Sequence, residues 1–74
     1  MNELRMKARH VNAVYMLCRK NEWFTCGSMR QYGKMFDMVD KGEAVHDIAL
    51  VIWICSDDVP FEQIETALTE IANG

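Results

Sequence analysis

The sequence predicts an all-α fold, a compact bundle of three to four short helices in which a central apolar helix covers about residues 44–55. Three features of the chain predict this fold. Ser28 and Gln31 have the spacing of a capping box, which starts a helix, and Gly42 suits a left-handed helix C-cap. Near the end of the chain, apolar side chains recur at the spacing of one helical face; they are Phe61, Ile64, Leu68 and Ile71.

The first two helices are expected at residues 3–21 and at about 29–41. The first has an apolar stripe at helical spacing, formed by Leu4, Ala8, Val11, Tyr15 and Cys18. Residues 21–27 break this period and supply turn-forming residues. The second helix follows the capping box and ends at Gly42. Its apolar face consists of Met29, Tyr32, Phe36 and Val39.

The third helix is expected over about residues 44–55 and the fourth over about 59–72. The third segment is apolar throughout most of its length, and its β-branched residues would also suit a buried strand. A helix is favoured because Asp47 complements the dipole of its first turn and because the chain offers no second strand-like run. Such a helix should be central, with Trp53 in the core. Residues 56–58 offer an N-cap for the fourth helix, and Pro60 suits its first turn.

Length and composition predict a single small intracellular domain over residues 1–74. The three cysteines form no CxxC pair, and an odd number of them fits a reducing cytosol better than a disulfide framework. The chain begins with no signal peptide pattern, and its longest apolar run, residues 48–55, is too short to span a bilayer. We therefore expect a soluble protein in the cytoplasm, without a membrane.

Charge is sorted along the chain. Residues 1–21 hold five cations and one acid, Glu3, whereas residues 43–74 hold seven carboxylates and no Lys or Arg. This asymmetry suggests that one end of the folded protein attracts acidic surfaces and that the other repels nucleic acid or imitates it.

No catalytic, metal or cofactor signature accompanies the charge pattern. His10, His46 and the three cysteines match no metal-ligand spacing, and cysteines in apolar stripes are usually core residues. Cys26 with either histidine would need a third, orienting group to act as a nucleophile. The sequence therefore predicts a protein that is not an enzyme and that has no cofactor.

A degenerate helix-turn-helix in the third and fourth helices is the alternative reading. Residues 47–59 have the apolar pattern of that motif, including Ile48-Ala49 early in its first helix. Two features oppose it. Trp53 stands where the tight turn usually has glycine, and the second helix would present carboxylates, where base edges and phosphates require Arg, Lys, Asn or Gln. Sequence-specific DNA binding is therefore not expected.

Direct contact with nucleic acid through the basic first helix is a minor hypothesis. Arg5, Arg9 and Lys20 would form that surface, although charged helix faces are usually only solvated. The favoured interpretation packs this helix near the acidic fourth helix, within one chain or between two copies.

Trp23 and Phe24 lie in the short segment between the first two helices. They either close the end of the bundle or lie exposed as an interaction site, and the sequence leaves both open.

Residues 23–57 carry a resemblance to known proteins. The pattern consists of Trp23-Phe24-Thr25-Cys26-Gly27, Gln31-Tyr32, Phe36, Gly42, His46-Asp47-Ile48-Ala49 and Val51-Ile52-Trp53-Ile54-Cys55-Ser56-Asp57. It resembles short uncharacterised proteins carried by phages and prophages of Gram-positive bacteria. The resemblance supplies no catalytic residues. It implies a context, because small phage proteins are frequently inhibitors or adaptors, anti-CRISPR proteins among them, that occupy the surface of a host protein.

The expected function is that of a non-enzymatic, phage-associated protein that binds and modulates another protein, such as a bacterial defence complex. An acidic surface would contact a basic surface of the partner. Its residues are Trp23, Phe24, Asp57, Asp58, Glu62 and Glu65. The alternative is a small transcriptional regulator with the degenerate helix-turn-helix, and a third reading is a structural homo-oligomer. The sequence leaves the partner and a homodimer open.

Overall fold

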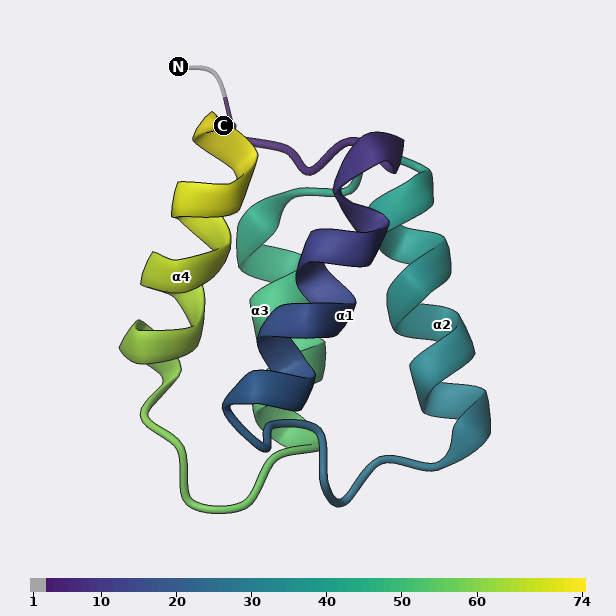
Figure 1. Cartoon of the computed structure of the whole chain (residues 1–74), viewed down its shortest axis with the longest axis vertical. Helices are drawn as coiled ribbons and strands as arrows, with labels where there is room; N and C mark the ends of the chain where they lie inside the picture. The colour runs from purple at the N-terminus through teal and green to yellow at the C-terminus, as the bar shows by residue number, and fades with distance from the viewer. Residues whose placement is uncertain (1–2) are drawn as a thin grey trace.

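Four α-helices and one 3₁₀ turn form the regular structure of this computed structural model, which describes residues 3–74 (Figure 1). In chain order these elements are η1 (Ala8–His10), α1 (Val11–Lys20), α2 (Met29–Asp40), α3 (Val45–Ile54) and α4 (Phe61–Asn73). The part of the chain that is described contains no strand, only an isolated bridge between Arg5 and Ala44. The predicted all-α fold is confirmed.

Helix α3 lies between α2 and α4 and packs on both, and α1 lies in front of it in the view of Figure 1. Ile48, Ala49 and Ile52 of α3 are completely buried, so the prediction of a central apolar third helix is confirmed. Helices α1 and α4 pack on one another as expected. Within residues 3–74, however, no ion pair joins them, and the sorted charges do not hold the two helices together.

The first helix is shorter than predicted, because residues 3–7 are extended. The amide of Val45, at the free N-terminus of α3, donates to the carbonyl of Leu4 at 2.9 Å, and the amide of Met6 donates to the carbonyl of Glu43 at 3.0 Å. An unpaired amide at a helix start needs such a partner. Met6 therefore enters the core, and Leu4, expected on the apolar stripe, is 38% exposed.

Both predicted ends of α2 are confirmed. The Ser28 hydroxyl accepts from the Gln31 amide at 3.2 Å, and the Gln31 side chain accepts from the Ser28 amide at 2.7 Å. At the other end Gly42 has a φ of 77°. Its amide donates to Val39, and the next amide donates to Met38, the paired hydrogen bonds of a Schellman motif.

The segment between α1 and α2 closes one end of the bundle. Trp23 and Phe24 are 4% and 1% exposed, and the Phe24 ring packs on Tyr32 at a centroid distance of 4.3 Å. Gly27 lies so close that a Cβ there would stand 2.1 Å from the Phe24 ring. The question that the sequence left open is thereby answered: both aromatic side chains are part of the core.

The fourth helix begins at Phe61, two residues later than predicted, and Ser56 does not cap it. The N-cap residue is Pro60, which has no side-chain capping hydrogen bond. Ser56 instead serves the preceding helix, since its hydroxyl donates to the Ile52 carbonyl at 2.6 Å and accepts from the Phe24 amide at 2.8 Å. It thereby ties the end of α3 to the aromatic segment.

We expect Gly33→Ala to stabilise the protein by about 0.5–1 kcal/mol, because glycine in a helix interior is entropically costly. Gly33 lies within α2 with no heavy atom near an added Cβ. Thermal unfolding measures the gain. The matched variant Gly27→Ala should melt at a lower temperature, because its Cβ collides with Phe24. A destabilised Gly33→Ala variant would contradict this description of α2.

His10 is a buried histidine at the start of α1. It is 7% exposed, its Nδ1 accepts from the Lys7 amide at 3.2 Å, and its Nε2 has no hydrogen-bond partner among residues 3–74. Burial, followed by the neighbouring charges of Arg9 and Lys7, lowers the pKa of His10 below its usual 6.5. Protonation of Nδ1 would also remove the acceptor of the Lys7 amide and place two N–H groups against each other.

The free energy of unfolding should therefore decrease as pH falls through about 6.5. The reason is that His10 binds a proton more readily in the unfolded chain than in the folded protein. The contribution of His10 is fully present above that pH. Melting temperatures at about pH 7.5 and 5.5 should differ less in His10→Gln, which keeps an acceptor but does not titrate, than in the wild type. His46→Gln serves as the control, in which the difference between the two melting temperatures should stay as large as in the wild type. An unchanged pH dependence in His10→Gln would contradict this role.

Candidate protein-binding surface

Two large apolar side chains at the end of α3 lie exposed. Trp53 is 44% exposed and Ile54 is 68% exposed, so the prediction that Trp53 belongs to the core is wrong. The physical reason is geometric: α3 is apolar on every side from Ile48 to Ile54, but its neighbours cover only part of its circumference near its end. Exposed apolar side chains that gather in one place mark interaction sites.

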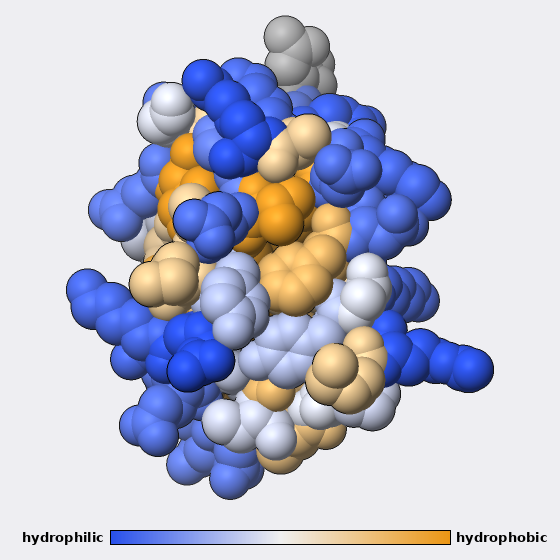
Figure 2. All heavy atoms as spheres, turned by 45° about the vertical axis from the view of Figure 1, so that its right-hand side comes forward, coloured by the Kyte–Doolittle hydropathy of each residue, from blue (hydrophilic) through white to orange (hydrophobic). Residues whose placement is uncertain are grey.

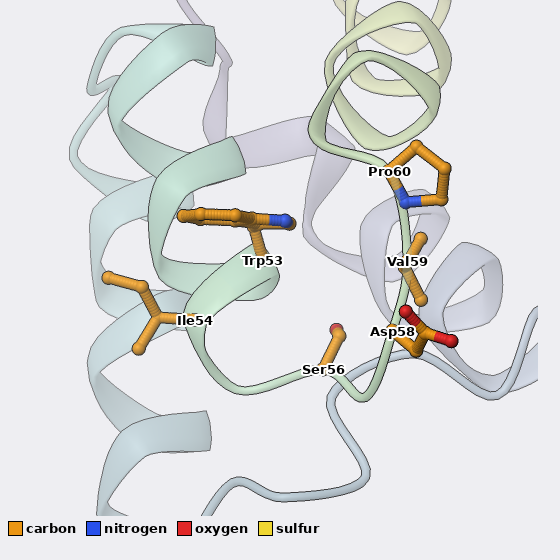
Figure 3. Close-up of a pocket in the computed structure, with 6 residues that line it drawn as sticks. All are labelled: Trp53, Ile54, Ser56, Asp58, Val59 and Pro60. Carbon is orange, nitrogen blue, oxygen red and sulfur yellow. The ribbon is translucent and has the colours of Figure 1, made fainter.

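An open depression lies beside these side chains, where α3 passes into the 55–60 loop (Figure 3). It has a volume of about 440 Å³. In Figure 3 the Trp53 ring projects from the helix toward the loop, and the side chains of Val59 and Pro60 stand across from it. The lining residues are Trp53, Ile54, Ser56, Asp58, Val59 and Pro60.

The orientation of Trp53 is fixed by the first turn of α4. Its ring meets Phe61 edge to face, at a centroid distance of 5.9 Å and an interplanar angle of 85°. Phe61 in turn contacts the His46 ring at 5.4 Å. Trp53 is therefore an exposed aromatic side chain with a supported position, which lowers the entropy that binding would cost.

The carboxylate of Asp58 lines the depression, and Asp57 and Glu62 lie close to it in the sequence. Asp57, Asp58 and Glu62 are exposed, and none of them takes part in an ion pair within residues 3–74. Glu65 differs, because its Oε2 lies 2.8 Å from Nδ1 of His46. Asp58 has a φ of 56°, a left-handed conformation that aspartate tolerates better than most residues.

We call this region the acidic–apolar surface. It comprises Trp53, Ile54, Asp57, Asp58, Val59, Pro60 and Glu62. Of the predicted residues, Asp58 lines the depression, Asp57 and Glu62 are exposed and lie within four residues of it in the sequence, and Glu65 lies one turn further along α4. Trp23 and Phe24 do not belong to it, because their burial leaves them unable to meet a partner. Sequence reasoning missed Trp53 and Ile54, although the unbroken apolar run from Ile48 to Cys55 was the signal.

The three cations of the minor nucleic-acid hypothesis do not form one patch. Arg5 lies in the extended segment, where Nη1 donates to the Gly42 carbonyl at 3.2 Å and Nη2 lies 3.3 Å from Glu3. Arg9 donates to the carbonyl of Gly74. Arg9 lies in η1, just before α1, and Lys20 is the last residue of α1, whose 10 residues span about 15 Å at 1.5 Å per residue. Arg5 and Arg9 thus make contacts within the chain, far from Lys20.

Helices α3 and α4 do not have the form of a helix-turn-helix. They run in opposite directions in Figure 1, and six residues, 55–60, separate them. The motif joins two helices at about 90–120° through a turn of three or four residues. This observation weighs against the alternative reading of α4 as a recognition helix.

A second partly apolar face lies over α1 and α2, where side chains of intermediate and high hydropathy are bordered by hydrophilic ones (Figure 2). Tyr15, Tyr32 and Phe36 form a chain of aromatic contacts at 5.7 and 5.8 Å. Arg19 covers one end, with its guanidinium 5.7 Å from the Tyr15 ring centre and Nη1 donating to the Tyr15 hydroxyl at 3.0 Å. The aromatic rings of this second face thus already contact one another within the chain.

Metal binding and cysteine reactivity can each be judged from the side chains of the residues that the structure describes. Across residues 3–74 no three His, Cys, Asp or Glu side chains are placed to hold a metal ion. Burial raises the pKa of the Cys18 thiol to about 11 and also raises the pKa of Cys55, which disfavours their nucleophilic thiolates. Among these residues, no helix has the length and apolar character that crossing a membrane requires.

Comparison with protein-family models, with curated proteins and with solved structures finds no match to this chain.

Proposed function

We propose that the chain is a non-enzymatic protein-binding module that uses its acidic–apolar surface to occupy a basic surface of another protein. The observation that carries this proposal is the exposure of Trp53 and Ile54 beside carboxylates that have no ion-pair partner within residues 3–74. A tryptophan in a supported position next to a depression has the properties of a binding hot spot.

The two components of the surface have different tasks in this proposal. Apolar contacts of Trp53 and Ile54 slow dissociation, since buried aromatic anchors supply most of the energy of an interface. The carboxylates of Asp57, Asp58 and Glu62 attract a basic partner and speed association, an effect that salt weakens.

The partner class follows from the charge and from the resemblance to small phage proteins. A protein with a basic nucleic-acid channel, such as a bacterial defence complex, offers the complementary surface. Occupation of that channel would inhibit the complex without any chemical step. The predominance of carboxylates after Lys41 supports this assignment over a nucleic acid as the partner.

The test is capture from a bacterial lysate by wild-type protein and by charge-reversed variants. We expect Asp57→Lys, Asp58→Lys and Glu62→Lys to reduce capture of the same protein, and paired reversals to reduce it further. Glu70→Lys, a reversal elsewhere on exposed α4, is the matched control. Folding of every variant is checked by circular dichroism. Full capture by all three reversals would contradict the proposed surface.

Inhibition of defence is tested separately. Expression of the protein in a host with active CRISPR immunity should restore phage plaques, and the paired Asp57→Lys and Asp58→Lys variant should not. Unchanged immunity would contradict this partner class.

A further inference from the structure

We propose that the depression beside Trp53 binds an arginine side chain presented by the protein partner. This inference rests on the proposed function, because it names the group that the acidic–apolar surface would receive. Two residues that line the same depression, Trp53 and Asp58, carry it.

The indole ring supplies a face for a planar cation. Trp53 is 44% exposed, and Phe61 supports it from the side of α4. Figure 3 shows the indole ring edge-on at the end of α3, with its nitrogen directed toward the side on which Ser56, Asp58, Val59 and Pro60 lie. A guanidinium that lies within about 6 Å of an indole centre is attracted by the negative potential of the ring face.

The carboxylate of Asp58 supplies the charge. It is exposed and belongs to no ion pair in the described part of the chain, so it is free to accept two parallel hydrogen bonds from a guanidinium. Asp57 and Glu62 add negative potential nearby, and no Lys or Arg follows Lys41 in the sequence. The depression is therefore complementary in charge to a cation.

The apolar walls favour arginine over lysine. Val59, Pro60 and Ile54 line the depression, and they would contact the methylene groups of the incoming side chain. A guanidinium is flat and more weakly hydrated than an ammonium group, and it stacks on aromatic rings. An ammonium group would lose more hydration in this setting and could not form the planar pair with Asp58.

The test uses three short peptides and nuclear magnetic resonance. Acetyl-glycyl-arginyl-glycine amide is titrated into labelled protein, together with its lysine and citrulline counterparts. Citrulline keeps the shape of arginine and removes the charge. The indole N–H signal of Trp53 should shift with saturation in the millimolar range, whereas that of Trp23, which is buried, should not. The arginine peptide should bind about tenfold more tightly than the citrulline peptide.

Four variants locate the contact. Asp58→Asn should weaken binding of the arginine peptide by about fivefold or more, and it retains a residue that tolerates the left-handed backbone at this position. Asp57→Asn removes the same charge next to the depression, which Asp57 does not line, and should change binding less than about twofold. Trp53→Phe should retain binding that Trp53→Leu loses, because leucine has no aromatic face.

The arginine site is wrong if the Trp53 signal does not move, if lysine and arginine peptides bind equally, or if the two asparagine variants weaken binding to the same degree. Any of these results leaves the proposed function standing when the surface still captures a partner from lysate. Loss of both peptide binding and capture would overturn the two proposals together.

Discussion

Phe24→Ala is expected to destabilise the protein by about 3–5 kcal/mol, the cost of truncating a fully buried aromatic side chain. Phe24 is 1% exposed, packs on Tyr32 at 4.3 Å and approaches the backbone of Gly27 closely. A domain of this length has a net stability of only about 3–5 kcal/mol, so a large fraction of the variant should be unfolded at room temperature.

Urea unfolding followed by far-UV circular dichroism measures this loss. Met29→Ala is the control, because Met29 is 87% exposed and its truncation should change the free energy of unfolding by less than about 0.5 kcal/mol. A Phe24→Ala variant that unfolds at the wild-type urea concentration would show that the segment between α1 and α2 does not close the core.

The second large effect is expected on binding, from Trp53→Ala. Truncation of a hot-spot tryptophan weakens a complex by about 2–4 kcal/mol, or roughly thirtyfold to a thousandfold in Kd. The cost to folding should be smaller, about 1–2 kcal/mol, because nearly half of the side chain is already exposed. Trp23→Ala should show the reverse, a large loss of folding stability and no direct loss of binding, since Trp23 is 4% exposed.

Surface plasmon resonance with the captured partner, together with thermal unfolding, separates the two effects. Trp53→Ala should retain its fold and dissociate quickly. An unchanged dissociation rate would exclude Trp53 as an anchor of the interface.

The helical fold was predictable because its signals are local. The Ser28–Gln31 capping box and the Gly42 C-cap depend on neighbouring residues, and both form as the sequence indicates. The extended start of the chain was not predictable, because Leu4 and Met6 pair with residues about forty positions away at the start of α3. The apolar spacing of residues 3–21 favoured a helix, and this long-range pairing prevailed.

The candidate surface was predictable only in part. The run of carboxylates after Lys41 indicated an acidic surface, and the structure leaves Asp57, Asp58 and Glu62 exposed, with Asp58 in the lining of the depression. Its apolar centre was assigned to the wrong aromatics, because composition does not reveal which side of an apolar helix its neighbours leave uncovered. Ser56 shows the same difficulty. It stands between two helices in the sequence and could have bonded to the end of either, and its hydroxyl bonds to the Ile52 carbonyl at the end of α3.

The most direct test of the acidic–apolar surface is site-specific photocrosslinking in a bacterial lysate. A photoreactive phenylalanine derivative replaces Ile54, which is 68% exposed and lines the depression, or Arg30, which is exposed on α2. We predict that the protein with the probe at position 54 crosslinks to one discrete host protein, and that Asp58→Lys in the same chain reduces this product. The probe at position 30 should give no such product. Crosslinking of the same protein from position 30 alone, or no discrete product from position 54, would contradict the account.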